Sequence, residues 1–200
     1  MTQQNLKNLS VLDQPLVSSC LFHPRTEGGY RPVNENRDDI LIKVDEDVDV
    51  AASFHFVGHD APVILFFHGN GEIVSDYDDL GCLYNDAGIN FFVVDYRGYG
   101  RSTGTPSVTS MMKDCHKIFN FLLKYKSKLK LSGPLSVMGR SLGSASAIEL
   151  CSTRSMDFKS LIIESGFALA VPLLQTLGID ALKIGFKEQQ GFENIDKISN

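Results

Sequence analysis

The chain alternates between apolar runs and amphipathic segments over most of its length. Residues 40–44 and 48–57 have strand-like composition and are separated by an acidic turn, which predicts an antiparallel hairpin. Past residue 58, four short runs are apolar almost throughout, as in strands that are covered on both faces. These runs are residues 63–67, 90–95, 135–138 and 161–163.

Amphipathic segments separate these buried runs. The clearest spans residues 107–127, where apolar side chains recur along one stripe of a helix. Further helices are expected at about 73–87 and 142–152. Because strands alternate with helices, the pattern predicts an α/β fold with a mostly parallel sheet, right-handed crossovers and helices on both faces. The N-terminal hairpin makes the expected sheet a mixed one.

Three parts are expected along the chain. Residues 1–39 form an irregular, polar N-terminal segment, and residues 40–167 form the α/β core. Residues 168–200 form a partial cap, with short helices expected at 168–177 and 180–186. The apolar residues of this last part suit either a lid over an acyl pocket or ordinary helix packing.

Composition narrows the class of protein. The chain has 200 residues, is 43% hydrophobic and carries a formal net charge of -5, which suits a globular domain and argues against a nucleic-acid binder. No run approaches the roughly 18 apolar residues of a membrane span, and the first residues lack the pattern of a signal peptide. The four cysteines are scattered and form no metal-ligand motif. We expect no metal, no cofactor and a cytoplasmic location.

One serine stands at a sharp turn after the third apolar run. Residues 139–143 read Gly-Arg-Ser-Leu-Gly, with a predicted strand before them and a predicted helix after them. In the G-x-S-x-G pattern the serine is strained, and larger neighbours would clash with the strand and the helix. We therefore predict that Ser141 is a nucleophile at the carboxyl edge of the sheet, facing free N–H groups of the helix. The alternative is a glycine-rich turn with an incidental serine.

The loop after the strand at 63–67 supports this prediction. Residues 68–71 read His-Gly-Asn-Gly. An oxyanion hole needs one N–H after the nucleophile and another from such a loop. The backbone N–H groups of Leu142 and Asn70 are the candidates. We expect His68 to organise the loop and not to act as a base.

A second glycine-containing loop, residues 95–107, reads DYRGYGRSTGTPS. Its glycine spacing departs from the dinucleotide-binding G-x-G-x-x-G pattern and no helix opens there, so nucleotide binding is disfavoured. We expect a tight loop that is braced by charges, with Asp95 as a partner for an arginine.

Taken in chain order, these motifs resemble the α/β-hydrolase superfamily. They are HGNG at 68–71, DYRGYGRSTGTPS at 95–107, GRSLGS at 139–144 and LIIESGF at 161–167. Within the superfamily, the chain is similar to the serine aminopeptidase-like hydrolases and to the Bem46-like and related esterases and thioesterases. The resemblance implies a serine hydrolase that cleaves a carboxylic ester, thioester or small amide through an acyl-enzyme on Ser141. It also implies a histidine base near the end of the protein.

The histidines depart from the family order, which is serine, then acid, then histidine. All five precede Ser141, namely His23, His55, His59, His68 and His116. We therefore expect none of them to serve as the base. Glu164 is the one later acid that is well placed, and we interpret it as a polar strand-end residue more than as the acid of a triad.

The simplest account is that the last two strand–helix units of the fold are absent from this chain, with residues 194–198 leading into the next strand. The strand at 161–163 then becomes an apolar sheet edge, which invites pairing. We expect a second polypeptide to supply the remainder, the chain to dimerise by exchange, or the chain to be incomplete. The competing functional hypothesis is a non-catalytic binding protein on the same scaffold.

Overall fold

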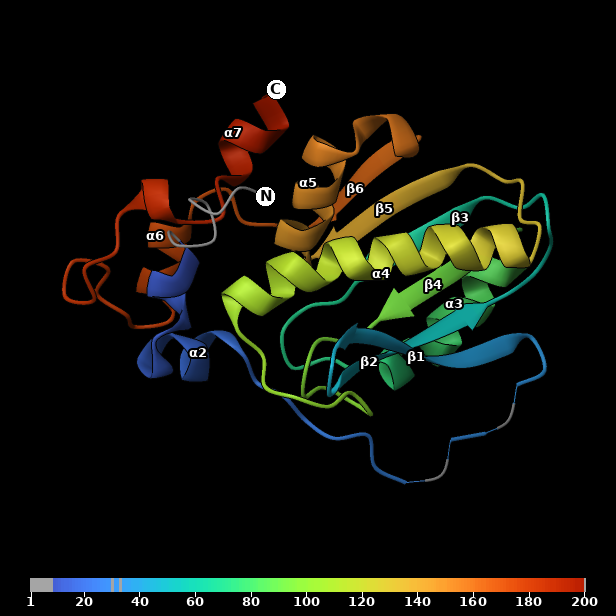
Figure 1. Ribbon diagram of the computed structural model, residues 1–200, viewed down its shortest axis with the longest axis horizontal. Coiled ribbons are helices and arrows are strands. Elements are labelled where there is room, and N and C mark those ends of the chain that lie inside the picture. The colour runs from blue at the N-terminus through green and yellow to red at the C-terminus, as the bar shows by residue number, and fades with distance from the viewer. Residues whose placement is uncertain (1–8, 30, 33, 200) are drawn as a thin grey trace.

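Six strands form one mixed sheet in the computed structural model, which describes residues 9–29, 31–32 and 34–199. Across the sheet the order is β1-β2-β4-β3-β5-β6 (Figure 1). The strands are β1 (Arg37–Asp45), β2 (Val48–His55), β3 (Val63–Phe67), β4 (Asn90–Val94), β5 (Leu135–Arg140) and β6 (Ser160–Glu164). The first three in spatial order pair antiparallel, and all later pairs are parallel. The predicted α/β fold with an N-terminal hairpin is confirmed.

Helices cover both faces of this sheet (Figure 1). The α-helices of the described residues are α2 (Pro15–Leu21), α3 (Asp78–Asp86), α4 (Val108–Lys128), α5 (Gly143–Thr153), α6 (Ala170–Thr176) and α7 (Asn194–Ser199). The short 3-10 helices are η1 (Ser10–Asp13), η2 (Val74–Tyr77), η3 (Ser155–Asp157) and η4 (Glu188–Gln190). Within this described part, no helix is long and apolar enough to cross a membrane.

Alternate residues of β3 point into two hydrophobic clusters, one on each face of the sheet. Leu65 and Phe67 join the large core that contains the apolar stripe of α4 and the small residues of α5. Ile64 and Phe66 point to the other face, where they meet the aromatic ring of Tyr77 and the apolar side of α3. Because side chains alternate along a strand, an all-apolar strand requires cover on both faces, as the sequence predicts.

The register of the parallel strands brings three loops together. Phe67 at the end of β3 pairs with Gly139 of β5, and Arg140 of β5 pairs with Glu164 of β6. The loops that follow these strands therefore emerge side by side at the carboxyl edge of the sheet. β6 is the edge strand, as expected, and its Ile162 and Ile163 are each 38% exposed.

Three segments differ from the sequence-based expectation. Residues 10–21 form η1 and α2 where an irregular segment is predicted, because their apolar side chains join the large core. Residues 180–186 make turns and no helix, since Gly185 adopts a left-handed φ of +70°. Residues 194–198 lie in α7, not in an extended run, and Lys197 ties this helix to α5 through a contact of 2.7 Å with Glu149.

Candidate active site

Ser141 occupies the turn between β5 and α5. Its φ is +48°, a left-handed conformation that a serine holds only under constraint. Part of the constraint is a hydrogen bond of 2.9 Å from the Ser141 backbone N–H to the carbonyl oxygen of Glu164, at the end of β6. The residue is exposed. The structure therefore exposes Ser141 at the carboxyl edge of the sheet.

The two glycines around Ser141 are required by close backbone contacts. A Cβ on Gly139 would lie 2.4 Å from the carbonyl oxygen of Gly143. A Cβ on Gly143 would lie 2.1 Å from the carbonyl oxygen of Phe67. Both distances are shorter than Cβ contacts in proteins, so the G-x-S-x-G spacing encodes the packing of α5 against β5 and β3.

Two backbone N–H groups lie in the loops that meet beside Ser141. Leu142 leads into α5, and Asn70 lies in the loop after β3. Within the residues described, neither N–H donates a hydrogen bond. The start of a helix favours negative charge, because its first amides lack partners and the helix dipole adds positive potential. These two amides are therefore available to an anionic oxygen.

His68 organises the loop that carries Asn70. Its ring is fully buried, with Nε2 3.0 Å from Asp95 Oδ1 and Nδ1 2.7 Å from the carbonyl oxygen of Gly69. The Tyr96 hydroxyl donates a hydrogen bond of 2.6 Å to the His68 carbonyl oxygen. His68 thus has the structural position that the sequence predicts for it.

The rest of the loop is also anchored. The Gly69 N–H donates to Glu72 Oε2 at 2.7 Å. The Asn70 side-chain oxygen accepts hydrogen bonds from the Tyr99 hydroxyl at 2.7 Å and from the His23 N–H at 2.8 Å. These contacts fix the loop around Asn70 before any ligand binds, which is the condition for a preorganised oxyanion hole.

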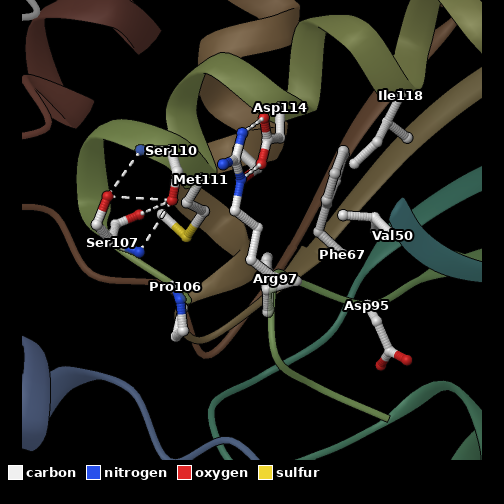
Figure 2. Close-up of a pocket in the computed structure, with 12 residues that line it drawn as sticks. Val50, Phe67, Asp95, Arg97, Pro106, Ser107, Ser110, Met111, Asp114 and Ile118 are labelled. Atoms are coloured by element: carbon white, nitrogen blue, oxygen red, sulfur yellow. Dashed lines mark hydrogen bonds and ion pairs between the residues drawn. The ribbon is translucent and has the colours of Figure 1, made fainter. Parts of the chain in front are cut away.

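The expectation that Asp95 pairs with an arginine is wrong. Asp95 binds His68 because β3 and β4 are neighbours and both residues follow their strands directly. The charge bracing of the loop is present but comes from Arg97. Its Nε and Nη2 bind the two carboxylate oxygens of Asp114 on α4 at 2.6 and 2.9 Å, as Figure 2 shows.

The family model described as serine aminopeptidase, S33 (Hydrolase_4) matches residues 58–183. The chain belongs to this family. The match begins at Gly58, between β2 and β3, and ends past α6, so it contains both loops and the turn at Ser141. The predicted resemblance to serine aminopeptidase-like α/β hydrolases is confirmed.

Two relatives of this S33-family chain come from yeast and chicken. Protein bem46 of Schizosaccharomyces pombe is 31% identical over 119 residues, which are 58% of this chain and 38% of that protein. Lysophosphatidylserine lipase ABHD12 of Gallus gallus is 34% identical over 116 residues, which are 56% of this chain and 29% of that protein. The matched region therefore spans well under half the length of these curated relatives.

Solved structures agree on the fold. A thermostable carboxyl esterase from Bacillus coagulans superposes with a TM-score of 0.57 at 17% identity, covering 72% of this chain and 51% of that one. The thioesterase domain from the curacin biosynthetic pathway gives a TM-score of 0.54 at 22% identity, covering 74% and 54% of the two chains. At these identities the likeness shows the α/β-hydrolase fold alone.

Within the described part of this S33-family chain, no histidine forms a hydrogen bond with Ser141. Three are hydrogen-bonded elsewhere: His59 to the Leu129 carbonyl oxygen, His68 to Asp95 and His116 to Glu149. His55 is fully buried, and its Nε2 lies 3.8 Å from Oδ1 of Asp78. His23 borders the loop that carries Asn70, with Nδ1 2.7 Å from the side-chain nitrogen of Asn70.

Glu164 is the last residue of β6 and pairs with Arg140, the residue before Ser141. Its carbonyl oxygen accepts the Ser141 N–H, while its half-exposed carboxylate lies 3.3 Å from Nε of Arg140. The Glu164 side chain therefore forms an ion pair with Arg140 at the edge of the site. Among the residues described, no group of three or more histidine, cysteine, aspartate and glutamate side chains is arranged to hold a metal ion.

The S33-family chain has a small cavity under α4 and an open groove along α6. The cavity in Figure 2 lies between α4 and the sheet, is lined by Met111, Ile118 and Phe67, and has a volume of about 10 Å³, which holds about one water molecule. Ser141 is not among its lining residues. An open apolar groove of about 340 Å³ runs along α6 instead, lined by Phe167, Ala168, Leu169, Pro172, Leu173 and Thr176.

Sequence reasoning did not single out Glu72, Tyr96 and Tyr99 as parts of the site. Tyr96 and Tyr99 lie inside a motif that carries the family resemblance, and Glu72 directly follows another. Hydrophobic periodicity gives no signal for them, because what they contact depends on how the loops after β3 and β4 meet.

Proposed function

We propose that this chain carries the nucleophile and the oxyanion hole of a serine hydrolase that cleaves a carboxylic ester, thioester or small amide. The observation that carries the proposal is the turn at Ser141, where an exposed serine with a φ of +48° stands beside two unpaired amides. Membership of a hydrolase family supports it.

In the proposed reaction the Ser141 oxygen attacks the carbonyl carbon of the substrate and gives its proton to a histidine base. The carbonyl oxygen becomes an oxyanion that accepts hydrogen bonds from the N–H groups of Asn70 and Leu142. The tetrahedral intermediate collapses to an acyl-enzyme as the leaving group departs with a proton from the base, and water then releases the acid. We assign the base and its acid to residues outside these 200.

The apolar groove along α6 supports a small molecule with an apolar acyl part as the substrate. It begins three residues after Glu164, whose carbonyl oxygen binds the Ser141 amide. Leu169 is 40% exposed there, although Leu174 and Phe186 of the same segment are buried. The segment thus combines a surface suited to an acyl chain with ordinary core packing.

A fluorophosphonate probe tests the proposal, because it phosphonylates only serines whose oxygen is activated. We expect the full-length protein to be labelled on Ser141 and the Ser141→Ala variant to stay unlabelled. The competing hypothesis is a non-catalytic binding protein, and the lack of a hydrogen bond between Ser141 and any described histidine favours it. A folded full-length protein that is not labelled supports that hypothesis and contradicts ours.

The exposed edge at β6 is the basis of a further part of the proposal. Ile162 and Ile163 lie on opposite faces of this strand and both are exposed, unlike the residues of β3 and β4. An apolar edge of this kind is normally covered. We assign its cover to further polypeptide, from the same protein or a second chain. Light scattering on the full-length protein distinguishes a monomer from a dimer. If a protease cleaves β6 rapidly in whichever state is found, the strand is not covered and the assignment is refuted.

A further inference from the structure

An ion pair joins the loop of Asn70 to the turn of Ser141, and the mechanism above does not use it. Arg140 is the last residue of β5 and directly precedes Ser141. Its Nη1 lies 2.7 Å from Oε1 of Glu72, which follows the loop that carries Asn70. The Arg140–Glu72 pair therefore connects the two segments that supply the proposed oxyanion-hole amides.

The carboxylate of Glu72 holds the loop backbone at the same time. Its other oxygen, Oε2, accepts the Gly69 N–H at 2.7 Å and the Tyr77 hydroxyl at 2.5 Å. Burial, and next the hydrogen bond to Glu72, raise the pKa of Tyr77 far above its ordinary value, so its hydroxyl remains a donor. Glu72 thus binds the Gly69 N–H, next to Asn70, with one carboxylate oxygen and Arg140 with the other.

Arg140 also reaches the third loop of the site. Its Nε lies 3.3 Å from Oε1 of Glu164, whose carbonyl oxygen accepts the Ser141 N–H. Ser165, which follows, has a left-handed φ of +49°, so the chain turns sharply there. From the end of β5, one guanidinium therefore contacts the segment after β3 and the last residue of β6.

We infer that Arg140 is a positioning residue, which sets the distance of the Asn70 N–H from Ser141 and Leu142 through Glu72. The inference rests on the proposed function. Oxyanion-hole amides stabilise charge that exists only in the transition state. A loop released from Arg140 should therefore lower kcat and leave KM nearly unchanged.

The test compares steady-state hydrolysis of p-nitrophenyl acetate by the full-length protein and its variants. We expect Arg140→Met to lower kcat about 10-fold, because misplacement of a catalytic group by about 1 Å costs up to 100-fold. Glu72→Gln keeps an acceptor for the Gly69 N–H but removes the charge, and should lower kcat to a similar extent. Because the two residues act as one unit, the double variant should be no slower than the worse single variant. Arg140→Lys should recover part of the rate.

Arg154→Met is the matched control. Arg154 forms a 3.0 Å ion pair with Asp157, and their side chains are 41% and 40% exposed, much like the 42% of Arg140. This control should keep the wild-type kcat, as most exposed ion pairs contribute little.

Three results would overturn the inference: an unchanged kcat in folded Arg140→Met, a change confined to KM, or losses in Arg140→Met and Glu72→Gln that multiply in the double variant. If Arg140→Met does not fold, Glu72→Gln alone decides by the same criteria. The wild type reports separately on the proposed function. If it neither hydrolyses the ester nor reacts with a fluorophosphonate, the proposed function fails and the role of Arg140 fails with it.

Discussion

Gly143→Ala adds one methyl group at the point where α5 touches the end of β3. The new Cβ would lie 2.1 Å from the carbonyl oxygen of Phe67 and 2.7 Å from that of His68. Both are backbone atoms, one in the sheet and one in an anchored loop, so neither can swing aside as a side chain does. Overpacking of a core typically costs about 1–3 kcal/mol. We expect the upper end here, a loss of about 3 kcal/mol in the free energy of unfolding.

Urea denaturation followed by circular dichroism measures this loss, since the chain has no tryptophan for fluorescence. In a domain of this size, about 3 kcal/mol corresponds to a decrease in Tm of about 6–12 °C. Gly58→Ala is the matched control, because its Cβ would meet its nearest atoms at ordinary distances of 3.6 and 3.8 Å. If both variants unfold at the same urea concentration, α5 does not approach β3 as described and the steric explanation of the motif is wrong.

Two further predictions concern buried charges. Burial opposes ionisation of Glu149 on α5, but hydrogen bonds and charge from His116 and Lys197 outweigh it and lower its pKa to about 2. Its stabilising effect is complete above the unperturbed pKa of 4.5 and is lost as pH falls toward 2. Tm should therefore decline more steeply in this range for the wild type than for Glu149→Gln, and parallel curves would contradict the assignment. Asp114→Asn removes the charge that binds Arg97 bidentately. It should lower the free energy of unfolding, measured by urea titration, by about 2 kcal/mol. A loss below about 0.5 kcal/mol would mean that the pair contributes no more than an exposed ion pair does.

The sheet and the turn at Ser141 could be predicted from the sequence for a physical reason. Runs such as 63–67 must be covered on both faces, and this restricts them to the middle of a parallel sheet. Gly139 is required by contact with the helix that directly follows it, so this part of the motif depends on elements adjacent in the chain, whereas Gly143 is required by the carbonyl oxygen of Phe67 on β3. Contacts between elements that are adjacent in the chain can therefore be predicted from the sequence.

The partners of charged side chains could not be predicted in the same way. Asp95 binds His68, not an arginine, because the spatial order of the strands places β4 beside β3. The Arg140–Glu72 contact likewise depends on the order of three loops at the sheet edge. Residues 10–21 are helical because they pack on a core made by later parts of the chain, which their own polarity does not reveal.

A crystal structure of the full-length protein after phosphonylation of Ser141 tests the central claim most directly. The phosphonyl oxygen takes the place of the oxyanion in the tetrahedral intermediate. We expect it to lie about 2.7–3.1 Å from the backbone nitrogens of both Asn70 and Leu142. An adduct whose oxygen points to solvent, or to other donors, would contradict the oxyanion hole and with it the proposed role of Ser141.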